Sequence, residues 1–178
     1  YVSTDPVVPS VTQAAARRPE ISRVAAADDA PEIRRMMVPD FELAGLDGER
    51  VRLSDVEAPV TLLYFWSKYR ECEADSQILQ RLQEKYSGQG LRILGLCYSS
   101  GTPEDVQDFL ESIDVHIPTL MCSQQVCDEY DVATFPTSYL LDGAGRVSYW
   151  MYGILVEEHW DELVADLLAG QAESAAGR

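Results

Sequence analysis

The sequence predicts an α/β domain in which helices cover both faces of one mixed central sheet. Two apolar runs of strand length, residues 60–66 and 91–98, are separated by an amphipathic helical pattern. This order predicts parallel strands joined by a right-handed crossover. Further on, the turn at 143–145 separates two more strand patterns, 137–141 and 146–152, which predicts an antiparallel hairpin. Helices before and after these strands must then lie on both faces of the sheet.

The first element of the domain is expected to be a second hairpin. Residues 41–43 and 51–53 flank Asp47-Gly48, a dipeptide that favours tight hairpin turns. The run over 60–66 that follows is almost entirely apolar, as expected of a central strand that is buried on both faces.

Helices are indicated by capping residues and by apolar side chains at helical spacing. The pattern over 73–86 predicts the crossover helix. Thr102 and Pro103, followed by two acidic residues, predict a helix start, because threonine caps and acids stabilise the positive helix end. The last helix is expected over about 156–168, with Gly170 closing it. Two shorter elements complete the order, a strand over 118–122 and a helix over 124–130.

The 178 residues suit one domain with tails. Residues 1–38 are polar and interrupted by proline, which is typical of an extended or partly disordered N-terminal tail or linker. The folded domain is expected over 39–170, followed by a polar C-terminal tail over 171–178. Because the chain begins with Tyr1 and not with Met, we expect that something preceded it, either a signal or anchor segment or simply further residues.

Composition excludes several classes of function. The net charge is −16, and such an acidic surface repels nucleic-acid phosphates and anionic lipid. No apolar run reaches 18 residues, so no transmembrane span is expected. The two histidines are not at metal-ligand spacing and no Cys-x-x-Cys pair exists, so we expect neither a metal site nor a cofactor.

Several motifs occur in the order that a known family shows. They are Pro39-Asp40-Phe41, Leu46-Asp47-Gly48, Arg52-Leu53-Ser54-Asp55, Phe65-Trp66-Ser67 followed by Tyr69, Phe135-Pro136-Thr137, and Gly143–Val147 with Gly153. Over residues 39–170 the chain resembles the thioredoxin fold, in the TlpA/ResA-like (redoxin) branch that adds an N-terminal β-hairpin and an inserted βα unit. The resemblance implies thiol-disulfide exchange outside the cytoplasm, in a periplasmic or membrane-anchored protein, often in cytochrome or membrane-complex maturation.

The family's central motif is degenerate in this chain. A working dithiol needs Cys-x-x-Cys, with one thiolate that attacks and a second thiol that resolves. An ungapped comparison places Arg70 and Glu73 at these two positions, and neither can form a mixed disulfide. The family's cis-proline, which lines the groove where a substrate backbone docks, is matched by Pro136.

Cys72, one residue away from the motif, is the candidate catalytic residue. A helix start with Lys68 and Arg70 nearby would lower its pKa, whereas Glu71 and Glu73 on either side would raise it. A one-residue gap would make Cys72 the resolving thiol, with no attacking thiol before it. The alternative is a neutral replacement in a motif that has lost its function.

Cys122 and Cys127 are five residues apart across a predicted strand–helix junction. They would form a disulfide if the loop brings their Cα atoms within about 7 Å. Otherwise each is an ordinary small buried side chain, as we expect for Cys97 in its strand.

These observations favour a non-catalytic protein that binds a partner or serves as a structural subunit of an extracytoplasmic or membrane-associated assembly. The partner is expected to be a protein, for example in a membrane or electron-transfer complex. It would dock through the N-terminal tail and an apolar face formed by Trp66, Tyr69, Phe135 and Pro136, unless Trp66 and Phe135 pack beneath the turn. The alternative is an enzyme, a thiol-disulfide oxidoreductase or peroxidase that uses the single Cys72.

Overall fold

The computed structural model describes residues 36–68, 70–99 and 101–176, with the backbone alone at 70, 71 and 175. Most of the predicted N-terminal tail lies outside these residues. In chain order the elements are β1 (Glu42–Ala44), β2 (Arg50–Arg52), the 3-10 helix η3 (Leu53–Asp55), β3 (Val60–Trp66), α1 (Arg70–Tyr86), the 3-10 helix η4 (Ser87–Gln89), β4 (Leu91–Cys97), α2 (Pro103–Ser112), β5 (Thr119–Met121), α3 (Gln124–Glu129), β6 (Thr137–Asp142), β7 (Val147–Tyr152) and α4 (Glu157–Ala176).

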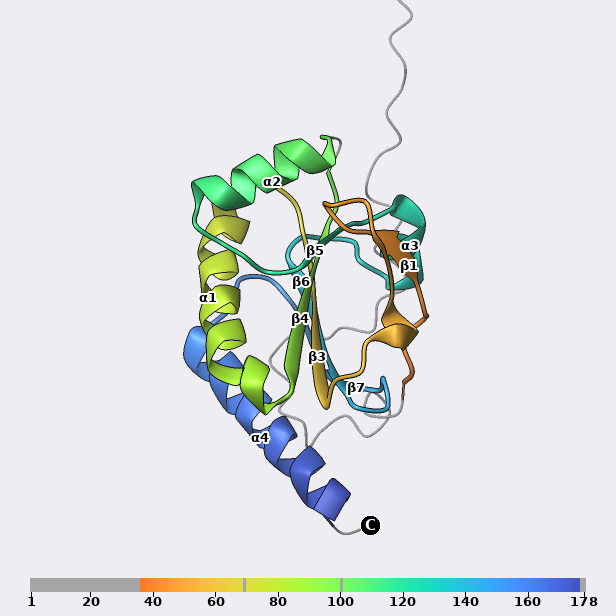
Figure 1. The fold of residues 1–178 in the computed structure, drawn as a ribbon, viewed down its shortest axis with the longest axis vertical. Helices are drawn as coiled ribbons and strands as arrows, with labels where there is room; N and C mark the ends of the chain where they lie inside the picture. The colour runs from red at the N-terminus through yellow and green to blue at the C-terminus, as the bar shows by residue number, and fades with distance from the viewer. Residues whose placement is uncertain (1–35, 69, 100, 177–178) are drawn as a thin grey trace, which may run out of the picture.

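The main sheet has five strands in the order β5-β4-β3-β6-β7. β3 pairs in parallel with β4, and β4 with β5, whereas β6 lies antiparallel to both β3 and β7. Figure 1 shows this sheet nearly edge-on, with α1, α2 and α4 on one side and α3 and the β1–β2 hairpin on the other. The predicted α/β fold, a mixed sheet with helices on both faces, is therefore confirmed.

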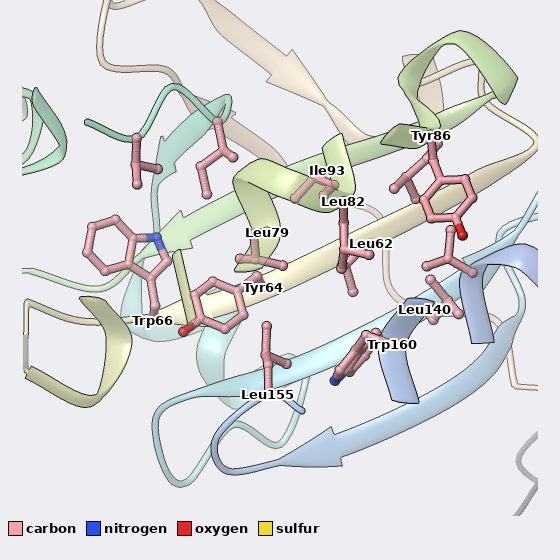
Figure 2. Packing of buried hydrophobic residues seen from close by; sticks show 14 of the residues in the cluster. Leu62, Tyr64, Trp66, Leu79, Leu82, Tyr86, Ile93, Leu140, Leu155 and Trp160 are labelled. Atoms are coloured by element: carbon pink, nitrogen blue, oxygen red, sulfur yellow. The ribbon is translucent and has the colours of Figure 1, made fainter. Parts of the chain in front are cut away.

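The core is divided by the sheet into two clusters of buried residues. All seven residues of β3 are buried, as its apolar run predicts, and they alternate between the two faces. One cluster joins Tyr64 and Trp66 of β3 to α1 and α4, where Trp160 is fully buried (Figure 2). The other joins Phe65 to the β1–β2 hairpin and to α3, and includes Cys127.

The end of β3 is fitted closely to its neighbours. The indole of Trp66 is fully buried and lies beside Gly95 of β4. A Cβ atom on Gly95 would stand 3.1 Å from Trp66 Nε1 and 3.0 Å from Thr119 Oγ1, tighter than ordinary contacts. Because Gly95 has no side chain, the indole of Trp66 can pack directly against the backbone of β4.

Capping residues in the sequence predicted the start of α2 correctly, but the predicted end of the last helix was wrong. Thr102 caps α2 in a reciprocal capping box with Asp105, as predicted. The expected end of the last helix at Gly170 was wrong, because α4 continues to Ala176. Glycine inside a helix costs only about 1 kcal/mol relative to alanine, and the residues that follow Gly170 are mostly good helix formers. In the described part of the chain, no helix is both long and apolar enough to cross a membrane.

Candidate functional site

The turn between β3 and α1 is where the lost dithiol motif falls. Tyr69 lies outside the described residues, and Arg70 begins α1 with no side-chain description. Glu73 is exposed on the first turn of that helix. Lys68 is also exposed, and its ammonium donates to the carbonyl oxygen of Asp105 at 3.3 Å.

Cys72 is buried, with an exposed fraction of 1%. It belongs to the core cluster that also contains Trp66 and Leu79. Its carbonyl oxygen accepts a hydrogen bond from Ser76 Oγ at 2.7 Å, which is a normal bond within a helix. Attack on an external disulfide requires an accessible thiolate, and the position of Cys72 provides no such access.

A carboxyl group lies in the same cluster. Asp75 is fully buried, and its two oxygens accept hydrogen bonds from Tyr64 Oη at 3.1 Å and from the Leu155 amide at 3.0 Å. Burial raises the pKa of Asp75 to about 6, and these two hydrogen bonds oppose the rise. Asp75 therefore changes its charge near neutral pH, which an exposed aspartate does not.

Tyr64 connects this carboxyl group to Cys72. The pKa of the Tyr64 hydroxyl is raised first by burial and then by its electrostatic and hydrogen-bond contacts with Cys72 and Asp75. We call these three residues the buried polar cluster. It contains a thiol, a phenol and a carboxyl group, which are groups that can transfer a proton. It has only one sulfur atom, whereas dithiol exchange needs two.

Sequence reasoning missed Tyr64 and Asp75. Asp75 stands three residues after Cys72 and four before Leu79, which places it on the inward face of α1. An acidic residue on the apolar stripe of a helix was a detectable signal, because a buried carboxylate needs partners.

The cis-proline loop matches the expectation from the resemblance. The Phe135–Pro136 peptide bond is cis, and the Pro136 carbonyl oxygen accepts a hydrogen bond from the Gly153 amide at 2.8 Å. Phe135 is half-buried and stacks on Tyr98, with ring centroids 5.7 Å apart. Trp66 is fully buried and packs against Phe109 of α2, so it cannot belong to an exposed docking face.

The exposed apolar side chains lie instead after β7. The exposed fractions of Tyr152, Ile154 and Val156 are 45%, 58% and 61%. Gly153, within this segment, is the residue bonded to Pro136. An exposed apolar ridge, Tyr152, Ile154 and Val156, therefore adjoins the cis-proline loop, and sequence reasoning did not find it.

Phe135 also lines a groove of about 410 Å³. Its lining residues are Tyr98, Gln124, Cys127, Asp128, Asp131, Val132, Ala133 and Phe135. The Tyr98 hydroxyl donates to Gln124 Oε1 at 2.7 Å, which joins the end of β4 to α3 along the rim.

None of the four cysteines, all of which the structure describes, is in a disulfide. The sulfur atoms of Cys122 and Cys127 are 3.5 Å apart, so the predicted pair is close but is present as two thiols. Cys97 is fully buried, and burial raises its pKa to about 12, as expected of a core thiol. Among the described residues, no group of three His, Cys, Asp or Glu side chains gathers to hold a metal ion.

The sheet order, the helices on both faces and the cis-proline loop, which enters β6 opposite the end of β3, define a thioredoxin-like protein of the TlpA/ResA-like branch. Comparison with family models agrees, since the model described as the AhpC/TSA family matches residues 35–150. The chain therefore belongs to the AhpC/TSA family.

Individual relatives support the same branch. The thiol-disulfide oxidoreductase ResA of Geobacillus thermodenitrificans is 32% identical over 123 residues, covering 67% of this chain and 70% of the relative. The thioredoxin-like protein YneN of Bacillus subtilis is 26% identical over 127 residues, covering 70% and 74%. Among solved structures, a putative thiol:disulfide interchange protein DsbE from Chlorobium tepidum superposes with a TM-score of 0.68 at 26% identity, covering 74% of this chain and 95% of that chain.

Proposed function

We propose that this protein has lost the dithiol chemistry of the turn before α1 and acts as a partner-binding or structural subunit of an extracytoplasmic or membrane-associated assembly. The observation that carries the proposal is the burial of Cys72, at 1% exposure, in a motif whose two dithiol positions hold Arg70 and Glu73. Thiol-disulfide exchange needs one thiolate that reaches the substrate and a second thiol that releases it. At this turn the sequence supplies neither in an accessible place.

The surface around the cis-proline loop supports partner binding. Tyr152, Ile154 and Val156 present apolar side chains to solvent beside Pro136, and apolar surface of this kind favours protein contacts. The chemistry that would recognise it is an apolar segment of another protein. The location outside the cytoplasm follows from the TlpA/ResA resemblance, and the part assigned to the N-terminal tail lies outside the described residues.

A second function has a specific observation in its favour. Cys72 and Asp75 both contact the Tyr64 hydroxyl, so a proton acceptor with a pKa of about 6 lies close to the thiol. Relatives of the chain are named thiol-disulfide oxidoreductases. A single-thiol oxidoreductase or peroxidase based on Cys72 would need the start of α1 to open before the thiol could react.

Catalysis is the first test. Insulin reduction by dithiothreitol is followed by turbidity with the native protein, with Cys72→Ser, and with Tyr69→Cys, whose added thiol stands three residues before Cys72. We expect the native protein and Cys72→Ser to leave the rate unchanged. Acceleration by Tyr69→Cys would show that the assay detects a restored motif. Acceleration by the native protein that disappears in Cys72→Ser would overturn the proposal in favour of the enzyme.

Partner retention is the second test. The native protein and three variants are purified from the cells that make the protein, and the bound proteins are identified. Cys72→Ser should retain the same partner, whereas Ile154→Asp should lose it. Met36→Asp is the matched control, because Met36 is equally exposed but is bonded to Val147, at the far end of β7. Loss of the partner in Cys72→Ser, or a partner held by a disulfide to Cys72, would contradict the proposal.

A further inference from the structure

We infer that Cys122 and Cys127 form a second thiol site, which exchanges reversibly with small, positively charged disulfides that enter the groove beside Phe135. This site lies on the opposite face of the sheet from Cys72, in the other core cluster. It does not depend on the function proposed above, because neither the turn before α1 nor the apolar ridge takes part in it.

The first support is the distance between the two thiols. Their sulfur atoms are 3.5 Å apart, and a disulfide bond is about 2.05 Å long, so a movement of about 1.5 Å closes it. Cys122 directly follows β5, and Cys127 lies in α3 one helical turn later. The Cys127 amide donates to the Ser123 carbonyl oxygen at 3.1 Å, which fixes this turn and keeps the two thiols together.

The second support is access from the groove. Cys127 is one of the residues that line the groove, but only 2% of its surface is exposed, so α3 must open locally, as α1 must at Cys72, before the thiol can react. The volume of about 410 Å³ is within the range of small-molecule sites and suits a compact disulfide better than a folded protein. The stacked rings of Tyr98 and Phe135 are the aromatic part of the groove lining.

The third support is charge. Asp128 and Asp131 line the groove, and no lysine or arginine is among its described lining residues. The whole chain carries a net charge of −16, so its field concentrates cations and repels anions. A disulfide with ammonium groups is therefore favoured over one with carboxylates.

Hydrogen bonding indicates which thiol reacts first. Burial raises the pKa of both thiols, and for Cys122 the neighbouring Cys127 raises it further. At Cys127 the hydrogen bond from Cys122 opposes the rise, because the Cys122 thiol can donate to a Cys127 thiolate, while the Asp128 carboxylate adds to it. Cys127, which is also the one of the two among the lining residues of the groove, is thus the attacking thiol and Cys122 the resolving thiol.

The reaction balances with the external disulfide, RSSR, as oxidant. The Cys127 thiolate attacks one sulfur of RSSR, a Cys127–S–S–R bond forms, and RS⁻ leaves and takes a proton from water. Cys122 then loses its proton and attacks Cys127 Sγ, and the second RS⁻ leaves. The protein loses two electrons and two protons, and RSSR becomes two RSH.

The test uses the reduced full chain and cystamine, a small disulfide with two ammonium groups. Mass spectrometry with peptide mapping should find a Cys122–Cys127 disulfide formed in the folded protein, with Cys72 and Cys97 still reduced. Dithiothreitol should reopen it without denaturant. A pair that stays reduced in the folded protein, or a disulfide that forms and never reopens, would overturn the inference.

Two variants test the order of attack. Cys122→Ser should accumulate a mixed disulfide between Cys127 and cysteamine, because no thiol resolves it. Cys127→Ser should accumulate none under the same conditions. The reverse pattern would show that Cys122 attacks first and would refute access through the groove. Cys72→Ser is the matched control and should oxidise at the native rate.

Charge selection is tested with three disulfides at equal concentration. Oxidation by cystamine should be about tenfold or more faster than by anionic oxidised glutathione, with neutral 2-hydroxyethyl disulfide in between. Replacing both Asp128→Asn and Asp131→Asn, or adding salt, should reduce this ratio. Asp108→Asn, an exposed acid of α2, should leave the ratio near the native value. Equal rates for all three disulfides in the native protein would refute the charge selection.

Discussion

Cysteines lie on both faces of the central sheet, but in different surroundings. On the α1 face, Cys72 is buried beside Tyr64 and Asp75, groups that can exchange a proton. On the α3 face, Cys122 and Cys127 have a sulfur partner at 3.5 Å, and Cys127 borders a groove. Exchange chemistry requires an attacking thiol, a resolving thiol and access, and the face that matches the family's active site shows only part of this set.

The comparison also separates two features that the family resemblance places together, the position of the active-site turn and the presence of two paired thiols. The turn before α1 lies at the position of the family's motif and has the buried Asp75 nearby, whereas the paired sulfurs lie on the other face of the sheet. The position of a motif in a fold therefore does not by itself assign the chemistry of a site. The following predictions test whether the α1 face is structural, beginning with the largest expected effect.

The largest effect is expected from Trp66→Ala. Trp66 is fully buried and packs 5.8 Å from the Phe109 ring, so its removal should lower the free energy of unfolding by about 3–5 kcal/mol. Phe135→Ala is the matched comparison, because Phe135 was predicted for the same docking face but is only half-buried. Urea unfolding measures both. A similar, small loss for the two variants would show that Trp66 is not part of the core.

The next effect concerns Asp75 and pH. Its pKa is about 6 in the folded protein against 3.8 when unfolded, so the folded state binds the proton more tightly. The stabilising contribution is complete below about pH 4 and is lost as the pH rises through about 6. A difference of about two pKa units corresponds to a loss of about 3 kcal/mol.

Asp75→Asn should remove this loss. The gain in free energy of unfolding, variant over native, should be larger at pH 7 than at pH 4. The difference between the two gains should be up to about 3 kcal/mol, less the cost of any weakened hydrogen bond to Tyr64. Urea unfolding at the two pH values measures the difference. Asp108→Asn, at an exposed position, is the control and should show no such gain. An Asp75→Asn gain that is equal at both pH values would contradict the proposed titration.

These sites also show what the sequence could predict. The apolar run of β3 and the Thr102 cap specify local structure through periodicity and capping, and both were predicted correctly. The burial of Cys72 and Asp75 was not predicted, because a polar residue near a helix start is ordinarily exposed to solvent. The spacing of Cys122 and Cys127 allowed either a bridge or separate thiols, since their distance depends on how α3 packs.

A smaller effect is expected from Cys72→Ala. Removing one buried sulfur atom should lower the free energy of unfolding by about 1 kcal/mol, because the buried side chain loses packing contacts. Partner retention should stay at the native level, because the apolar ridge is intact. Urea unfolding and the partner assay measure the two quantities. A stable variant that no longer retains the partner would indicate that the Cys72 thiol itself has a function.

The smallest effect concerns the ion pair between α1 and α4. Arg81 and Glu157 form two hydrogen bonds of 2.7 and 2.8 Å, but both side chains are about half exposed. A double-mutant cycle with Arg81→Ala and Glu157→Ala should give a coupling of about 0.2–1 kcal/mol that declines with salt.

The same variants show what keeps Cys72 closed. If the buried contacts of Leu79 and Trp160 hold α1 and α4 on the sheet, alkylation of Cys72 should remain as slow in Arg81→Ala as in the native protein. Alkylation of the Cys122–Cys127 pair serves as the internal reference, since these thiols lie on the other face. A selective acceleration at Cys72 would mean that a surface ion pair controls access to the thiol. The α1 face would then contain a gated thiol, and the contrast between the two faces would lie in the resolving thiol that the α3 face supplies.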